Sequence, residues 1–145
     1  MIKDNVERPV LVSACLMGLP CRYDGKTCIP SQEVMDLVKK SRAMPICPEQ
    51  LGGLPTPRPP AEISKGRVIN SNGEDVTENF LRGAEISAKL ARLFGAKLAI
   101  LKDKSPSCGS TLIYDGSFTE QLIEGEGMTT ALLKREGVTV RPPLT

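Results

Sequence analysis

Five cysteines and the absence of histidine define the chemistry open to this chain. Without an imidazole, neither Ser-His-Asp nor Cys-His catalysis can be assembled within the chain, and zinc sites that need histidine are excluded. Proton transfer would fall to carboxylates, hydroxyls, lysine or water, and a transition metal would be bound mainly by thiolates. The number is odd, so the cysteines cannot all pair with one another: Cys15, Cys21, Cys28, Cys47 and Cys108.

Three of the cysteines follow predicted buried strands. Cys15 and Cys47 come directly after the apolar runs 10–14 and 43–46, and Cys108 lies in the loop after a third run. Ligands of parallel sheets bind at the carboxyl ends of the strands, so we expect the three thiols to meet at one rim. The chain has no C-x-x-C pair, which argues against a zinc ribbon, a thioredoxin-like site and a bacterial ferredoxin.

Three thiolates from three loops can hold a 4Fe–4S cluster in which one iron has no protein ligand. Such an iron is a Lewis acid that prefers soft donors such as sulfur, which indicates substrate chemistry. Two alternatives remain open at this point. One is a non-catalytic domain whose thiolates hold zinc or a cluster for structure or sensing; the other is a small-ligand binder with cysteines packed in its core. For Cys21 and Cys28, structural burial is the expectation.

Residues near these cysteines add possible catalytic groups. Glu49 lies two residues after Cys47 and could act as a general base toward water, or be a solvated or arginine-paired carboxylate. The segment 105–109 can present hydroxyls and backbone N–H groups to a ligand, or be a tight turn. Three basic residues could supply positive charge near an anionic product: Arg58, Lys102 and Lys104.

The elements that must position these groups alternate between strand and helix. Strands are predicted at 10–14, 43–46, 97–101 and 138–140, and helices at 31–40, 77–94 and about 129–136. Alternation of this kind predicts an α/β, Rossmann-like layered domain with a small, mainly parallel sheet flanked by helices.

Three further features of the pattern can be checked against the structure. The segment 45–60 holds six of the twelve prolines, so we expect a rigid loop there, with no helix and no central strand. Residues 67–73 suggest a small hairpin with an Asn-Gly turn. The helix 77–94 should bury one face and end at Gly95; that face comprises Phe80, Ala84, Ala88, Ala91 and Phe94.

Length and composition place the chain among single globular domains. It has 145 residues, of which 40% are hydrophobic and 25% charged, with a formal net charge of +2. One domain over 1–145 is expected, and the charge is too balanced to indicate nucleic acid or a membrane surface. The first apolar run is shorter than a secretory core of about seven residues. We therefore expect a cytoplasmic protein with reduced thiols.

The motifs together resemble the TudS-type thiouracil desulfidases, over roughly residues 10–140. As a set and in this order they are specific to that family, although each alone is weak. They are SACLMG at 13–18, CRYDG at 21–25, CPE at 47–49, GGL at 52–54, PRP at 57–59, KSPSCG at 104–109 and TTA at 129–131.

The resemblance implies a 4Fe–4S cluster held by Cys15, Cys47 and Cys108, with Glu49 and Ser105 in catalytic positions. The iron without a protein ligand would take the sulfur of a thiolated pyrimidine of the 2-thiouracil or 4-thiouridine class. Water activated by the glutamate would replace C=S by C=O and release sulfide, without net oxidation or reduction. Four residues are predicted to contact this small-molecule substrate: Arg58, Lys104, Ser107 and Gly109.

Overall fold

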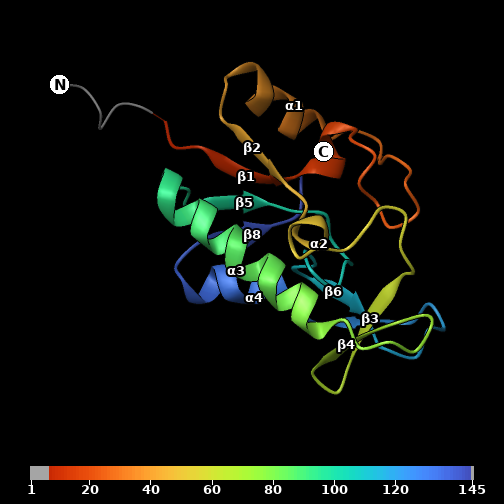
Figure 1. Cartoon of the computed structure of the whole chain (residues 1–145). Coiled ribbons are helices and arrows are strands. Elements are labelled where there is room, and N and C mark those ends of the chain that lie inside the picture. Colours follow the sequence, from red (N-terminus) through yellow and green to blue (C-terminus); the bar gives the residue numbers. More distant parts are fainter. Residues whose placement is uncertain (1–6, 145) are drawn as a thin grey trace.

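The structure, a computed structural model that describes residues 7–144, is built on a four-stranded parallel sheet (Figure 1). The strand order is β2-β1-β5-β8, and every neighbouring pair is parallel. The strands are β1 (Val10–Ser13), β2 (Ala43–Ile46), β5 (Leu98–Ile100) and β8 (Thr139–Arg141). They lie within a residue or two of the predicted runs, and the predicted fold class is confirmed.

Helices cover both faces of the sheet (Figure 1). Helix α1 (Gln32–Lys39) lies on one face, and α3 (Thr77–Phe94) and α4 (Met128–Arg135) lie on the other. Helix α1 begins where the sequence predicts, because the Ser31 hydroxyl accepts the Val34 N–H at 3.3 Å. Helix α3 also ends as predicted, at Gly95 in the left-handed conformation with a φ of 70°. No helix among residues 7–144 is both long and apolar enough to cross a membrane.

Strand β1 is buried on both faces, as its uninterrupted apolar sequence predicts. Val10 and Val12 belong to the apolar cluster that includes Val34 of α1. Leu11, which points to the opposite face, belongs to the cluster that includes Ala88 of α3. The strand therefore joins both halves of the core, and its carboxyl end is fixed from both sides.

Two short hairpins extend from the sheet. The first pairs β3 (Ala61–Ser64) with β4 (Arg67–Asn70), and the second pairs β6 (Leu112–Tyr114) with β7 (Leu122–Glu124). The hairpin expected across Asn72-Gly73 is present as an antiparallel bridge between Ile69 and Asp75, and Arg67–Asn70 also pairs, more extensively, backward across the turn at 65–66. The second hairpin was not predicted, because residues 115–121, which join its strands, form a longer connection than a two-residue turn, although they begin with Asp115-Gly116.

Two expectations were wrong: that segment 45–60 has no helix, and that Phe94 is buried. Pro48–Leu51 forms a short helix, α2, inside the proline-rich segment; Pro48 stands at its first position, where a missing N–H costs nothing. Pro45 lies in β2, an edge strand, where proline is tolerated. Phe94 is 59% exposed and Ala96, just after the turn at Gly95, takes the buried place at 2%.

Helices α2 and α3 approach so closely that only glycine fits at two contact points. A Cβ atom at Gly52 would lie 1.9 Å from the carbonyl oxygen of Asn79, and one at Gly83 would lie 1.9 Å from the carbonyl oxygen of Pro48. The Asn79 side-chain amide also donates to the Gly52 carbonyl at 2.9 Å. The short helix that follows Cys47 is thus held against the longest helix of the protein.

Substituting Gly83→Ala tests this contact. In an unconstrained helix the change stabilises a protein by about 1 kcal/mol. Here we expect a loss of about 2–3 kcal/mol, because the added methyl group forces α2 away from α3. Urea unfolding measures it, with Glu85→Ala, an exposed position on the same helix, as the control. A Gly83→Ala protein as stable as its parent would contradict the close contact.

Candidate functional site

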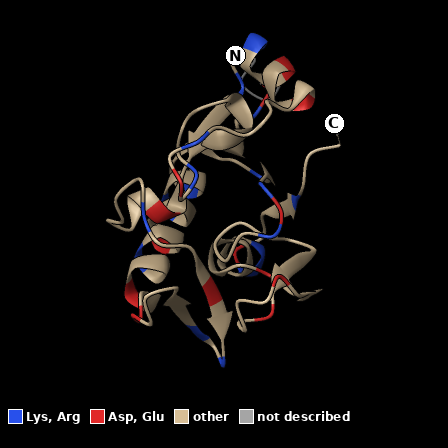
Figure 2. Ribbon diagram, turned by 90° about the vertical axis from the view of Figure 1, so that its right-hand side faces the viewer, with Lys and Arg blue, Asp and Glu red and all other residues tan. Residues whose placement is uncertain are grey.

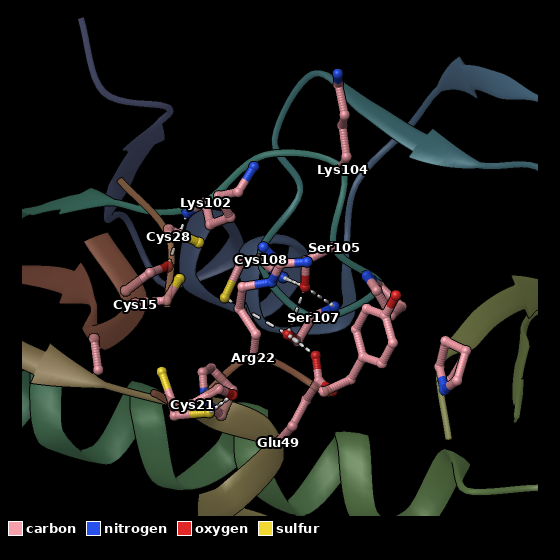
Figure 3. Close-up of a pocket in the computed structure, with 18 of the residues that line it drawn as sticks. Cys15, Cys21, Arg22, Cys28, Glu49, Lys102, Lys104, Ser105, Ser107 and Cys108 are labelled. Carbon is pink, nitrogen blue, oxygen red and sulfur yellow. Dashed lines mark hydrogen bonds between the residues drawn. The ribbon is translucent and has the colours of Figure 1, made fainter. Parts of the chain in front are cut away.

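All five cysteines line one cavity of about 310 Å³ at the carboxyl edge of the sheet. Figure 3 shows the sulfur atoms of Cys15, Cys21, Cys28 and Cys108 around a common space, with Glu49 and Ser107 on its wall. Among residues 7–144 no disulfide forms, and all five thiols are free. The predicted meeting of three cysteines at one rim is confirmed, and two further thiols join them.

The first two predicted ligands are positioned by the ends of adjacent strands. Cys15 lies in a 3-10 helix, η2 (Ala14–Met17), that directly follows β1. Cys47 is the N-cap residue of α2, directly after β2. Since β1 and β2 pair in parallel register from Val10 opposite Ala43 onward, both thiols leave the sheet at the same edge.

The third predicted ligand lies in a loop that is anchored on the N-terminus of α4. Backbone N–H groups of the helix's first turn donate to this loop: Met128 to the Pro106 carbonyl, and Thr129 and Thr130 to the Ser107 carbonyl. The Thr130 hydroxyl donates to the Cys108 carbonyl at 3.0 Å. These bonds satisfy the free N–H groups of the helix and fix the Cys108 backbone.

Asp103 holds the other end of the same loop. One carboxylate oxygen accepts the backbone N–H groups of Lys104, Ser110 and Thr111 at 2.9–3.1 Å. The second oxygen accepts the Thr111 hydroxyl. Burial opposes ionisation, but these hydrogen bonds outweigh it and lower the pKa of Asp103 to about 2. The carboxylate is therefore a structural anchor, although it also lines the cavity.

The thiols lie close enough to influence one another. A hydrogen bond with Cys15 raises the pKa of Cys21 to about 11, and an opposing hydrogen bond with Cys47 lowers it less. The hydrogen bond with Cys21, together with burial, also raises the pKa of Cys47. Burial raises the pKa of Cys108 to about 12, with Glu49 adding to the effect. Without a metal, the thiols of Cys21, Cys47 and Cys108 are thus protonated at neutral pH.

A buried ion pair connects Glu49 to the cysteine loops. Arg58 Nε donates to Glu49 Oε1 at 2.9 Å, and the two side chains are only 5% and 15% exposed. The same guanidinium donates to the Cys21 carbonyl at 3.0 Å and to the Thr56 hydroxyl at 2.8 Å. The other oxygen, Glu49 Oε2, accepts the Ser107 hydroxyl at 3.0 Å. Both carboxylate oxygens are therefore held in place.

The structure brings together most of the residues predicted for the site. Besides the three cysteines, the cavity is lined by Glu49, Ser105, Arg58, Lys104 and Ser107. Gly109 does not appear among the lining residues; its N–H donates to the Ser105 carbonyl at 2.9 Å, and a Cβ there would lie 2.8 Å from that oxygen. Lys104 is exposed and directed away from the sulfur atoms (Figure 3).

Several lining residues were not singled out from the sequence. Cys21 and Cys28 were expected to be structural, and two tyrosines, Tyr23 and Tyr114, were not assigned a role. Cys21 is indeed buried, at 8% exposure, but it also faces the cavity. Its place in the CRYDG motif was the available signal. Tyr114 lies on β6, whose hairpin the sequence did not indicate.

The donor set fits an iron–sulfur cluster better than a single metal ion. No three Cys, Asp or Glu side chains within residues 7–144 are close enough together to hold one ion. A zinc ion keeps its sulfur ligands about 2.3 Å away and therefore needs tightly gathered thiolates. A 4Fe–4S cluster offers a different iron to each cysteine, so its ligands can be farther apart.

Basic and acidic residues are interspersed on the side of the molecule that faces the viewer in Figure 2.

Comparisons with known proteins agree with these features. The model of the 2-thiouracil desulfurase family matches residues 10–142. The chain is 43% identical to the uncharacterized protein YbbK of Bacillus subtilis (strain 168) over 141 residues, which is 90% of this chain and 93% of that protein. It is also similar to the solved structure of a 4Fe–4S-dependent thiouracil desulfidase, TudS. That match has a TM-score of 0.90 and 48% identity, and covers 94% of this chain and 91% of the other.

The pH dependence of stability tests the Asp103 anchor. Because its pKa is lowered to about 2 in the folded protein, the carboxylate contributes fully above its unfolded value of about 4. That contribution is lost as the pH falls through about 2. We expect Asp103→Asn to lower the free energy of unfolding by about 1–2 kcal/mol at neutral pH, and the gap to close between about pH 4 and pH 2.

Urea unfolding of parent and variant across that pH range measures the gap. Asp36→Asn is the control, because Asp36 is exposed on α1 and accepts only the Gln32 amide at 2.9 Å among the hydrogen bonds described. A gap for Asp103→Asn that stays constant down to pH 2 would show that the charge of this carboxylate does not anchor the loop.

Proposed function

The chain belongs to the 2-thiouracil desulfurase family, and from that premise we propose how its site removes sulfur from a thiolated pyrimidine. It is an iron–sulfur-dependent enzyme that converts C=S to C=O and releases sulfide. The substrate class that we propose is a free base or nucleoside such as 2-thiouracil or 4-thiouridine. The gathering of five free thiols around one cavity beside a fixed carboxylate carries this proposal.

We propose that Cys15, Cys47 and Cys108 hold the 4Fe–4S cluster. They come from three different loops at the strand ends and line the same cavity. A cluster held by three thiolates supplies a thiophilic Lewis acid at its remaining iron. Because the pKa values of Cys47 and Cys108 are raised without a metal, cluster binding must displace the protons of these two thiols. A cytoplasmic location, where thiols remain reduced, suits such a site.

Glu49 is proposed as the base that takes a proton from the attacking water. It is the carboxylate nearest in sequence to Cys47, and it lines the cavity. Arg58 and Ser107 hold its two oxygens at 2.9 and 3.0 Å, so its direction is fixed before substrate binds. Carboxylates of this kind contribute about 10²–10⁴-fold to catalysis by proton transfer.

Other lining residues are proposed to receive the pyrimidine ring. Tyr23 and Tyr114 offer flat faces suited to a ring. Ser105 is proposed to contact the substrate by turning its hydroxyl hydrogen from Ser107 toward the ring, and Lys104 to add positive charge at the mouth. Arg58 and Ser107, which were predicted to touch the substrate, act on Glu49 instead in this proposal, because their polar atoms are taken up by protein partners.

A non-catalytic domain that holds a cluster or zinc for structure or sensing is the alternative. The fixed position of Glu49 favours catalysis, because a purely structural site gains nothing from a carboxylate that is 15% exposed in the cavity wall. The two readings differ in a measurable product, sulfide.

The variants Glu49→Ala and Glu49→Gln decide between them. We expect Glu49→Gln to retain the visible absorption, iron and acid-labile sulfide of the parent, because it removes no thiol and keeps a side-chain oxygen for Arg58 or Ser107. Glu49→Ala, which leaves Arg58 unpaired, is compared at equal cluster content. Sulfide release from 2-thiouracil or 4-thiouridine should fall by at least about 100-fold, because the water loses its base. Anaerobic reconstitution, an absorption spectrum and a sulfide assay measure this.

The matched control is Glu124→Gln, an exposed glutamate on β7 outside the cavity lining. It should release sulfide at the parental rate. A Glu49→Ala protein with parental activity would overturn the role of this residue, and a parent that binds the cluster but releases no sulfide from either compound would favour the non-catalytic alternative.

A further inference from the structure

Ser107 is a buried serine whose hydroxyl bridges the two residues proposed for catalysis. It is 2% exposed. Its Oγ atom lies 3.0 Å from Glu49 Oε2 and 2.9 Å from Ser105 Oγ. No direct contact between Glu49 and Ser105 is found among the described hydrogen bonds, so these two groups communicate through Ser107.

The hydrogen atoms in this chain can be assigned from the partners of each oxygen. Ser105 Oγ accepts the backbone N–H groups of Ser107 and Cys108, both at 3.0 Å. A hydroxyl has two lone pairs and one hydrogen, so with both lone pairs engaged Ser105 is left as a donor. A carboxylate only accepts, so Ser107 donates its hydrogen to Glu49 at 3.0 Å, a shorter and charge-assisted bond than the one to the Cys108 sulfur at 3.6 Å, and accepts that of Ser105. The chain therefore runs from Ser105 through Ser107 to Glu49.

We propose that Ser107 is a positioning residue that holds the Ser105 hydroxyl and the Glu49 carboxylate in one hydrogen-bonded chain, and that it does not itself touch the substrate. This inference rests on the proposed function. Because both lone pairs of Ser105 are engaged and its hydrogen goes to Ser107, a substrate atom that bonds to Ser105 must be an acceptor that takes this hydrogen over from Ser107, such as a thiocarbonyl sulfur or a ring carbonyl oxygen. The water proton must go to the opposite end of the chain, to Glu49.

Arg58 completes the arrangement at the carboxylate. Because its Nε takes Glu49 Oε1 at 2.9 Å, Oε2 is the oxygen left to Ser107. The loop that carries both serines is in turn held by α4 and Asp103. Two separate parts of the fold thus meet at the hydrogen bond between Ser107 and Glu49, which joins residues 58 positions apart in the sequence.

A double-mutant cycle on Ser105→Ala and Ser107→Ala tests the coupling in the reconstituted holoenzyme. We expect kcat for 2-thiouracil to fall about 10–100-fold in each single variant, with KM for Ser107→Ala changed by less than about threefold. The double variant should be no slower than Ser105→Ala alone, because both substitutions break one chain. Ser107→Thr, which keeps the hydroxyl, should recover most of the activity.

Binding of uracil to the cluster-free variants gives a readout that does not need activity. If Ser107 only positions its neighbours, Ser107→Ala should weaken uracil binding by less than about threefold in calorimetry. A direct hydrogen bond from Ser107 to the ligand would cost about tenfold, and that result would overturn the inference. Thermal unfolding and the cluster spectrum check that each variant is folded and loaded.

Ser110→Ala is the matched control in the same loop. Among the described residues its hydroxyl is buried without a hydrogen-bond partner, so its removal should leave sulfide release at the parental level. If the losses of kcat in the two single variants multiply in the double variant, or if Ser107→Ala has parental activity, the coupling through Ser107 is wrong although the protein is an enzyme. A parent and a Ser110→Ala protein that both lack sulfide release would instead refute the proposed function.

Discussion

The buried ion pair of Arg58 and Glu49 is the interaction on which the arrangement of this site depends. Arg58 comes from the proline-rich segment, yet its guanidinium bonds to α2, to the Thr56 hydroxyl and to the Cys21 carbonyl. Its backbone N–H also donates to the Tyr23 carbonyl at 2.7 Å. A buried ion pair costs desolvation of both charges, so good geometry and further hydrogen bonds must offset that cost. One side chain thereby joins Glu49, the proposed base, to the loop that carries Cys21.

The electrostatics of the cavity follow from the close approach of several thiols and one carboxylate, Glu49. Cys108, Cys47 and Cys21 all have raised pKa values, through burial and through one another. The negative charge of Glu49 adds to the rise at Cys108. Thiolates in this cavity therefore need compensating positive charge, which the iron of the proposed cluster would provide in place of protons. The same cavity that disfavours free thiolates is thus suited to thiolates bound to a metal.

Much of the fold and part of the site could be predicted, because those features depend on local sequence. Adjacent residues suffice to predict the strands, the helix N-cap at Ser31 and the helix end at Gly95. The parallel pairing of the strands then brings three cysteines to one edge of the sheet. The contacts between distant segments could not be predicted in the same way. The glycine contact of α2 with α3 and the pairing of Arg58 with Glu49 depend on tertiary packing. That packing pairs Arg58, a predicted substrate contact, with Glu49, the proposed base.

The absence of histidine has a physical consequence for a site of this kind. Imidazole suits iron as a ligand, so a histidine base beside a cluster would compete for the iron that the substrate must reach. A carboxylate two residues from Cys47 could compete as well, if it were free to turn. Arg58 and Ser107 hold both oxygens of Glu49. If the Glu49 side chain turned toward the metal, it would break these two hydrogen bonds in a mostly buried cavity, at a cost of about 1–3 kcal/mol each. In the proposed function, Arg58 and Ser107 would thus keep Glu49 from binding the iron while leaving it at the cavity wall.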